Sequence, residues 1–258
     1  MLALRASAYL AFQVMTVVPW ALACLVLAPM PRRLRYRFTI QWPRMCIWAA
    51  RVLLGIRWRV IGAEHLPQGP AILLSKHQST WETLFYPPYM PRELCFVFKR
   101  ELLWLPFFGW GIGLLDMIHI DRTKGRDAFE QVVQQGRHKL AEGRWIIMFP
   151  EGTRTPVGSQ GRYRSGGARL AVRTGTPVVP IAVNSGEFWA RKAFIKRPGL
   201  ITVSIGAPIA PDEQTPDALM ARVEQWIEAE MRRLSPHLYR DAHRAAPASV
   251  RDATDVAL

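Results

Sequence analysis

The hydrophobic pattern divides the chain near Gly55. Before that residue, positions 6–30 are almost wholly apolar, with Ser7, Gln13 and Thr16 as the exceptions. A run of about 25 apolar residues is long enough to cross the core of a bilayer. After Gly55, short apolar runs alternate with amphipathic stretches and with glycine or proline turns. The pattern therefore predicts an N-terminal membrane-associated helical segment followed by an α/β domain.

Short apolar runs after Gly55 predict the strands of one sheet. They lie at residues 57–62, 71–75, 94–99, 116–121, 145–150, 177–183 and 200–206. The run at 71–75 is apolar on both faces, which is typical of a central strand. Amphipathic stretches predict helices at 125–143 and at 216–234. Strands that alternate with helices indicate an α/β fold with a largely parallel sheet flanked by helices, and functional side chains are expected at the carboxyl ends of its strands.

We expect three segments: membrane-associated helices at 1–56, an α/β domain at 57–235, and a polar tail at 236–258. Three interpretations compete for the first segment. A secretory signal could end near "ALA" before Cys24, although the following "MPRRLRYRF" is an unusual start for an exported protein. A transmembrane helix would place the arginines on the cytoplasmic side, but Pro19 would kink it. These two interpretations differ in whether the segment stays in the mature protein.

The third interpretation is a helical hairpin that lies half-buried in the membrane surface. The chain would turn at "PMP" and return as an amphipathic helix from about Arg33 to Leu54, with arginines along one side. We expect membrane attachment, and the sequence leaves open whether the segment spans the bilayer or re-enters it.

The charge of the chain points to a partner that carries phosphate. The sequence has 34 Lys+Arg against 20 Asp+Glu, which suits nucleic acid, anionic lipid or a small phosphorylated substrate. Residues 1–62 contain nine arginines and no Asp, Glu or Lys, and these arginines alternate with aliphatic and aromatic residues. A nucleic-acid arm would not need so much apolar surface. We therefore expect a membrane lipid partner and no nucleic acid.

The stretch "KHQSTWET" follows the expected central strand and contains His77 and Glu82. On one helix, five residues would separate them by about 140°. They can therefore meet only if His77 lies in the loop and Glu82 in the first helical turn. Ser79, three residues before Glu82, predicts a capping box in which Glu82 accepts from the Ser79 amide. The pair could also be a general base whose ring the carboxylate holds in one tautomer.

The stretch "FPEGTRT" also follows a predicted strand. Gly152 would let the backbone approach an anion closely, and the guanidinium of Arg154 suits phosphate recognition. The alternative is an ordinary turn with an internal ion pair between Glu151 and Arg154. The three cysteines, Cys24, Cys46 and Cys95, follow no metal or disulfide pattern and are expected to be buried. We expect neither a metal nor a cofactor.

These stretches resemble the sequence blocks of the glycerolipid acyltransferases. "HQSTWE" resembles their His-x4-Asp block, and "FPEGTRT" resembles their Phe-Pro-Glu-Gly-Thr-Arg-Ser block. Between them "GLLDMIHIDR" is similar to the second block, and "VVPIAV" is similar to the fourth. The resemblance covers Trp58 to about Ile209. One position departs from the family pattern, because Glu82 stands where the family usually has Asp.

The resemblance implies transfer of an acyl chain from acyl-CoA or acyl carrier protein to the sn-2 hydroxyl of lysophosphatidic acid. His77 would be the base and Glu82 would orient it. The substrate phosphate would bind near residues that the resemblance and their positions at strand ends single out: Lys99, Arg122, Glu151, Gly152 and Arg154. It also implies a bacterial inner-membrane enzyme with its active site toward the cytoplasm.

Three alternatives remain open at the level of the sequence. The enzyme could acylate another lyso-lipid, such as a lyso-ornithine lipid or a different lysophospholipid. The chain could be a lipid-binding relic that has lost turnover. The same histidine and carboxylate could also activate water in a hydrolase.

Overall fold

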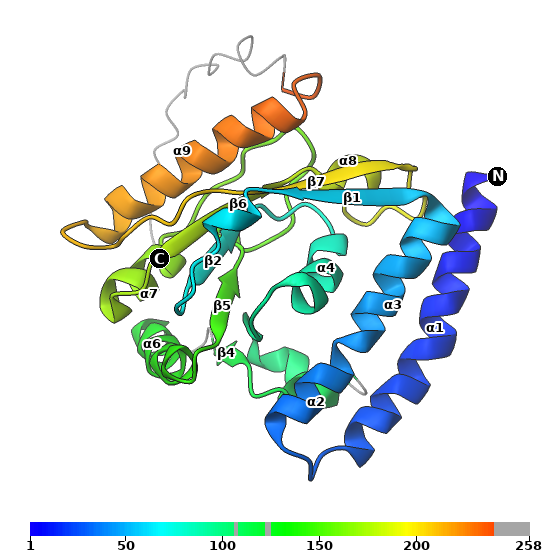
Figure 1. Ribbon diagram of the computed structural model, residues 1–258, viewed down its shortest axis with the longest axis horizontal. Helices are drawn as coiled ribbons and strands as arrows, with labels where there is room; N and C mark the ends of the chain where they lie inside the picture. Colours follow the sequence, from blue (N-terminus) through cyan, green and yellow to red (C-terminus); the bar gives the residue numbers. More distant parts are fainter. Residues whose placement is uncertain (106–107, 122–124, 240–258) are drawn as a thin grey trace, which may run out of the picture.

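The computed structural model describes residues 1–105, 108–121 and 125–239. The described residues form one seven-stranded sheet with the order β1-β7-β6-β2-β5-β3-β4 and helices on both faces (Figure 1). The strands are β1 (Ile56–Ile61), β2 (Ile72–Ser75), β3 (Leu94–Lys99), β4 (Ile118–Ile120), β5 (Trp145–Met148), β6 (Val178–Val183) and β7 (Gly199–Ile205). Only the β6–β7 pairing is antiparallel. The predicted α/β fold with a largely parallel sheet is confirmed.

Strand β2 lies at the centre of the sheet, between β5 and β6, and all four of its residues are buried. Its side chains alternate between two hydrophobic clusters: Leu73 belongs to one, while Ile72 and Leu74 belong to the other. Burial on both faces is the arrangement that the continuous apolar run predicted. The carboxyl end of β2 therefore opens at the middle of the sheet, with β5 and β6 ending beside it in parallel.

Helices from the C-terminal half cover one face of the sheet. They are α6 (Gly125–Ala141), α7 (Gly166–Thr174) and α9 (Pro216–Leu234). Helix α9 packs against β6 and α7, and its buried residues Val223 and Ile227 join the cluster that contains Leu74. The shorter helices are α4 (Trp81–Tyr89), α5 (Phe108–Gly113) and α8 (Ser185–Phe188). Trp81 and Phe85 of α4 belong to the other cluster, on the opposite face of the sheet.

The N-terminal segment forms a helical hairpin beside the sheet (Figure 1). Its helices are α1 (Leu2–Val26), α2 (Arg32–Thr39) and α3 (Gln41–Ala49), and a short π-helical turn, η1 (Ala50–Leu54), follows. Helix α1 is the first limb of the hairpin, and α2, α3 and η1 form the second. Hydrogen bonds join the two limbs, among them Arg5 Nε to the Leu53 carbonyl at 2.5 Å and Tyr9 Oη to the Cys46 carbonyl at 3.2 Å. The segment has the hairpin shape of the third interpretation, although its second limb is divided at Ile40 and is not one helix.

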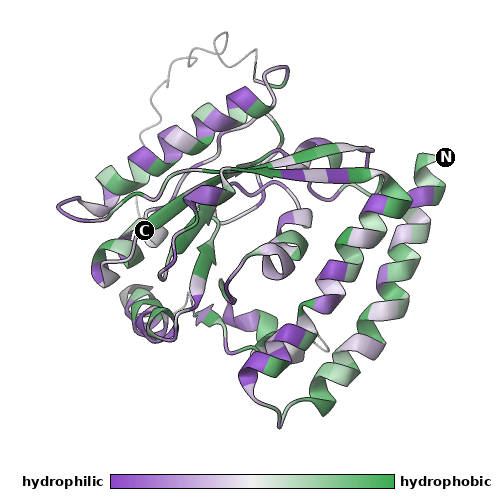
Figure 2. Ribbon diagram, viewed as in Figure 1, coloured by the Kyte–Doolittle hydropathy of each residue, from purple (hydrophilic) through white to green (hydrophobic). Residues whose placement is uncertain are grey.

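The outer face of α1 is apolar, as Figure 2 shows for most of its length. Val14 is 60% exposed and Met15 is 75% exposed. Among the described residues α1 is the one helix that is long and apolar enough to cross a membrane, and 11% of its apolar window is buried against the protein. Large apolar side chains directed outward along a whole helix need a partner other than water, and this indicates membrane association.

Candidate active site

His77 lies in the loop that follows β2, between the strand and helix α4. Its backbone is held on both sides by the loop that follows β5. The His77 amide donates to Glu151 Oε1 at 3.1 Å, and its carbonyl accepts from the Thr155 amide at 2.8 Å and the Thr155 hydroxyl at 3.1 Å. Two loops far apart in the sequence thus fix the position of this residue at the carboxyl edge of the sheet.

Glu82, in the first turn of α4, bonds to the His77 ring. Nδ1 of His77 lies 2.5 Å from Glu82 Oε2, and the Glu82 side chain is fully buried. Since a carboxylate accepts hydrogen bonds, Nδ1 carries the proton of the neutral ring, and Nε2 then has the lone pair. Within the described residues no hydrogen bond uses Nε2, and the His77 side chain is 12% exposed. The ring therefore presents a proton acceptor to an incoming molecule.

The other oxygen of Glu82 caps the start of the helix. Oε1 accepts from the amides of Gln78 and Ser79, each at 2.9 Å, and from the Ser185 hydroxyl. The expected bond to the Ser79 amide is present, while the Ser79 hydroxyl accepts from the Trp81 amide and not from that of Glu82. One carboxylate thus makes both kinds of contact that the sequence suggested: one oxygen accepts from amides at the helix start, and the other bonds the His77 ring.

Two further residues that sequence reasoning did not single out complete this arrangement. Phe149, the last residue before the Pro-Glu-Gly turn, stacks on the His77 ring with centroids 3.8 Å apart and planes 15° apart. Ser185 follows β6, whose carboxyl end lies beside that of β2. Polar residues after an apolar strand, Asn184 and then Ser185, were the available signal. That β6 lies next to β2, however, is known only from the folded sheet.

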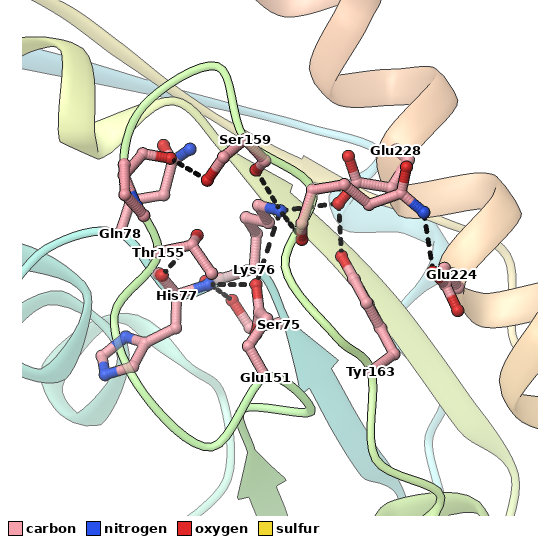
Figure 3. A network of polar contacts seen from close by, with 12 residues as sticks. Ser75, Lys76, His77, Gln78, Glu151, Thr155, Ser159, Tyr163, Glu224 and Glu228 are labelled. Carbon is pink, nitrogen blue, oxygen red and sulfur yellow. Dashed lines mark hydrogen bonds and ion pairs between the residues drawn. The ribbon is translucent and has the colours of Figure 1, made fainter. Parts of the chain in front are cut away.

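A buried ionic cluster lies beneath the His77 loop (Figure 3). Lys76 is fully buried, and its Nζ lies 2.6 Å from Glu228 Oε1 and 3.6 Å from Glu151 Oε1. The Tyr163 hydroxyl donates to Glu228 Oε1 at 2.8 Å. Burial raises the pKa of the Glu151 carboxyl to about 7, and the Lys76 ammonium opposes part of that rise.

The turn after β5 holds Gly152 and Arg154. Gly152 has φ +68°, in the left-handed region that favours glycine. In the described part of the chain the Arg154 guanidinium has no hydrogen-bond or ion-pair partner, and its Nε is buried. The alternative ion pair between Glu151 and Arg154 is not present there, because Glu151 pairs with Lys76. Arg154 directly precedes Thr155, which bonds the His77 carbonyl, so its backbone lies beside the histidine loop.

The remaining predicted residues lie on the outer strands. Lys99 is exposed at the carboxyl end of β3, where it pairs in register with Ile120 of β4. Because β3 is parallel to β5, Lys99 is at the same edge of the sheet as the residues that follow β5. Arg122 lies outside the described residues.

The fold is α/β, and a histidine paired with a carboxylate at the carboxyl edge of its mainly parallel sheet is chemically suited to act as a general base. A family model described as Acyltransferase matches residues 57–184, which include both loops of the site. The chain belongs to this acyltransferase family and is an enzyme.

Individual relatives agree with this assignment. The chain is 44% identical over 229 residues to the 1-acyl-sn-glycerol-3-phosphate acyltransferase of Pseudomonas aeruginosa, and the match covers 87% of this chain and 89% of that protein. It is 33% identical over 181 residues to the alpha form of this enzyme from Mus musculus, covering 69% of this chain and 64% of the mouse protein.

A solved structure has the same fold. The 1-acyl-sn-glycerophosphate acyltransferase PlsC from Thermotoga maritima matches with a TM-score of 0.74 and 20% identity. The match covers 90% of this chain and 95% of that one. The likeness thus extends over nearly the whole of both chains.

Proposed function

We propose that this enzyme transfers an acyl chain from a thioester donor to the sn-2 hydroxyl of 1-acylglycerol-3-phosphate, which yields phosphatidic acid. The observation that carries the proposal is the bond from His77 Nδ1 to the buried Glu82 carboxylate, which leaves Nε2 as a proton acceptor. The names of the Pseudomonas and mouse relatives support the choice of acceptor.

In the proposed reaction the sn-2 oxygen attacks the thioester carbonyl while His77 Nε2 takes the hydroxyl proton. The tetrahedral intermediate then expels the thiolate, which receives the same proton from Nε2, so the histidine is regenerated. Glu82 keeps Nδ1 protonated and stabilises the imidazolium that exists between the two steps. Three donors fix the other oxygen of Glu82, so the carboxylate is held in place before substrate binds.

The acceptor phosphate would bind at Arg154. Its guanidinium has no internal partner among the described residues and follows a glycine turn that permits close approach of an anion. Lys99 and Arg122 are proposed as further cationic partners from the same edge of the sheet.

We propose a different role for Glu151, whose side chain is 1% exposed. Direct contact with a phosphate would bring two negative charges together, whereas the present contacts of Glu151 hold the His77 amide. Glu151 would therefore hold the His77 backbone in position without contacting the substrate.

The N-terminal hairpin supports a proposal about the location of the enzyme. Its arginine-rich limb is proposed to lie at the cytoplasmic face of a bacterial inner membrane, where it would attract anionic lipid and keep the site near an insoluble acceptor. Acyl-CoA and acyl carrier protein are both suitable donors for the proposed reaction.

The direct test uses the purified protein in detergent with lysophosphatidic acid and an acyl thioester. Phosphatidic acid should form with the wild type and not with His77→Ala. An active His77→Ala variant would refute the mechanism. Thioester cleavage without acceptor would indicate a hydrolase instead. A panel of lysophospholipids and lyso-aminolipids, each tested with one acyl-CoA and one acyl carrier protein, identifies the acceptor and the donor separately.

A further inference from the structure

We infer that Glu228 of helix α9 is a positioning residue for the proposed acyl transfer, and that it acts through Lys76 on the loop that carries His77. The inference rests on the proposed function for its kinetic readout. It assigns a role in catalysis to a helix that contributes no group to the reacting centre.

The first link is the contact between α9 and Lys76. Nζ of Lys76 lies 2.6 Å from Glu228 Oε1, and both side chains are almost completely buried, at 0% and 3% exposure. The ammonium also donates to the carbonyls of Gln160 at 2.9 Å and Ser159 at 3.2 Å, and it lies 5.6 Å from the centre of the Tyr163 ring. Each of these neighbours presents negative charge, a lone pair or a ring face to the Lys76 ammonium.

The second link runs from Lys76 to the histidine by two routes. Lys76 is covalently adjacent to His77, at the point where the chain leaves β2. Its Nζ also lies 3.6 Å from Glu151 Oε1, the same oxygen that accepts the His77 amide at 3.1 Å. Figure 3 shows Glu228, Lys76, Glu151 and His77 following one another from α9 to the histidine loop. Movement of Lys76 would therefore act on the His77 backbone through the peptide bond between them and through Glu151.

Burial of this cluster is costly for the fold, which makes a purely stabilising role a poor explanation. Charges taken out of water regain their solvation only through good partners, and apolar side chains of similar volume often serve stability equally well. Among the residues that the structure describes, neither Oε2 of Glu151 nor Oε2 of Glu228 has a hydrogen-bond partner, and both atoms are buried. What the ionic cluster supplies is a directional restraint on the chain segment next to His77.

The test compares Glu228→Gln with Glu224→Gln. Glu224 lies one turn earlier on α9 and bonds Gln160 Nε2 at 2.7 Å, so it contacts the same loop without contacting Lys76. We expect Glu228→Gln to lower kcat by about tenfold to a hundredfold, because a displacement of 1 Å at a reacting group can cost about 100-fold. The KM values for acceptor and donor should stay within about twofold, since no binding group is changed. Glu224→Gln should match the wild type.

A double variant checks that Glu228 acts through Lys76. If the two residues form one unit, Lys76→Met with Glu228→Gln should lose no more activity than the worse single variant. Losses that multiply would overturn the inference. A Glu228→Gln enzyme with a lowered unfolding temperature and a wild-type kcat would overturn it as well. Should Glu228→Gln fail to fold, Tyr163→Phe removes only the hydroxyl that bonds Glu228, and a smaller kcat loss is then expected.

A second readout separates this inference from the proposed function. The protein has six histidines, and the ¹⁵N signals of His77 can be assigned by their loss in His77→Asn. Glu228→Gln should shift or broaden these signals, and Glu224→Gln should not. A wild-type enzyme that does not acylate lysophosphatidic acid would refute the proposed function alone. Unchanged His77 signals in folded Glu228→Gln would refute the positioning role alone.

Discussion

Replacement of Glu82 by glutamine separates the two tasks of this side chain. Glutamine has the same length, and its carbonyl oxygen can still accept from the amides of Gln78 and Ser79, as in other capping boxes. Its NH₂ group would then face His77 Nδ1 in place of Oε2. Two donors cannot share a hydrogen bond, so the ring must move its proton to Nε2 and accept at Nδ1. The proposed base is then protonated at the atom that should react.

The expected loss is large, because reversal of the tautomer in the comparable histidine and carboxylate pair of serine proteases lowers kcat by about 10⁴-fold. This corresponds to about 5 kcal/mol at 1.36 kcal/mol per factor of ten. The effect on folding should be smaller. The capping bonds persist and only their charge assistance is lost, which we expect to cost about 1–2 kcal/mol in the free energy of unfolding.

The assay measures kcat for phosphatidic acid formation together with denaturant unfolding of the same protein samples. Thr83→Val is the matched control, because Thr83 is the next residue of α4 and its hydroxyl donates to the Thr80 carbonyl at 2.7 Å, away from His77. The control should keep the wild-type kcat. If Glu82→Gln keeps kcat within about threefold of the wild type and loses stability alone, Glu82 is a capping residue and the catalytic reasoning is refuted.

Further predictions concern other parts of the structure. Glu82→Asp should lower kcat by about 100-fold, because this chain's loop and helix are positioned for a side chain one methylene longer than the Asp that the family usually has; wild-type turnover would contradict this. Arg154→Ala should raise the KM for lysophosphatidic acid by about 10- to 100-fold and leave that for the thioester unchanged, because a charge-assisted bond contributes about 1.5–3 kcal/mol. Met15→Asp should weaken liposome binding, whereas Ala229→Asp, on the exposed side of α9, should not; equal binding of both would exclude α1 as the membrane contact.

The raised pKa of Glu151 predicts how the free energy of unfolding depends on pH. Burial raises its pKa from 4.5 to about 7, so between these values the folded protein binds the proton more tightly than the unfolded chain. Its contribution to stability is therefore present below about pH 4.5 and is lost as the pH rises through about 7. From pH 5 to pH 8 the wild type should lose about 2.5 kcal/mol relative to Glu151→Gln, at 1.36 kcal/mol per pKa unit. A pH-independent difference between the two unfolding free energies would show that Glu151 does not titrate in this range.

The sequence predicted those elements whose periodicity agrees with their final packing. The strand at 94–99 and the helix at 216–234 match β3 and α9 at both ends. Helix α7 was missed. It is short and begins with Gly166 and Gly167, which are poor helix formers, and it is stabilised by tertiary burial of Ala168 and Leu170.

The site was predictable where its contacts are local. His77 and Glu82 are five residues apart, so strand, loop and helix signals were enough to place them in contact. The partner of Lys76 is Glu228, which is 152 residues away along the chain. No local pattern indicates which of many acidic residues approaches a buried lysine. That pairing depends on the packing of α9 against β6 and α7.

The double use of Glu82 has a consequence for how the enzyme should fail when heated. The first turn of a helix opens more easily than the core of a sheet, because local openings need less free energy than global unfolding. Opening of the first turn of α4 would free the same carboxylate that orients His77. Catalytic competence would then disappear while the central strands remain paired. Loss of turnover on warming should therefore begin below the melting temperature, be fully reversible on cooling, and coincide with hydrogen exchange at the Ser79 amide.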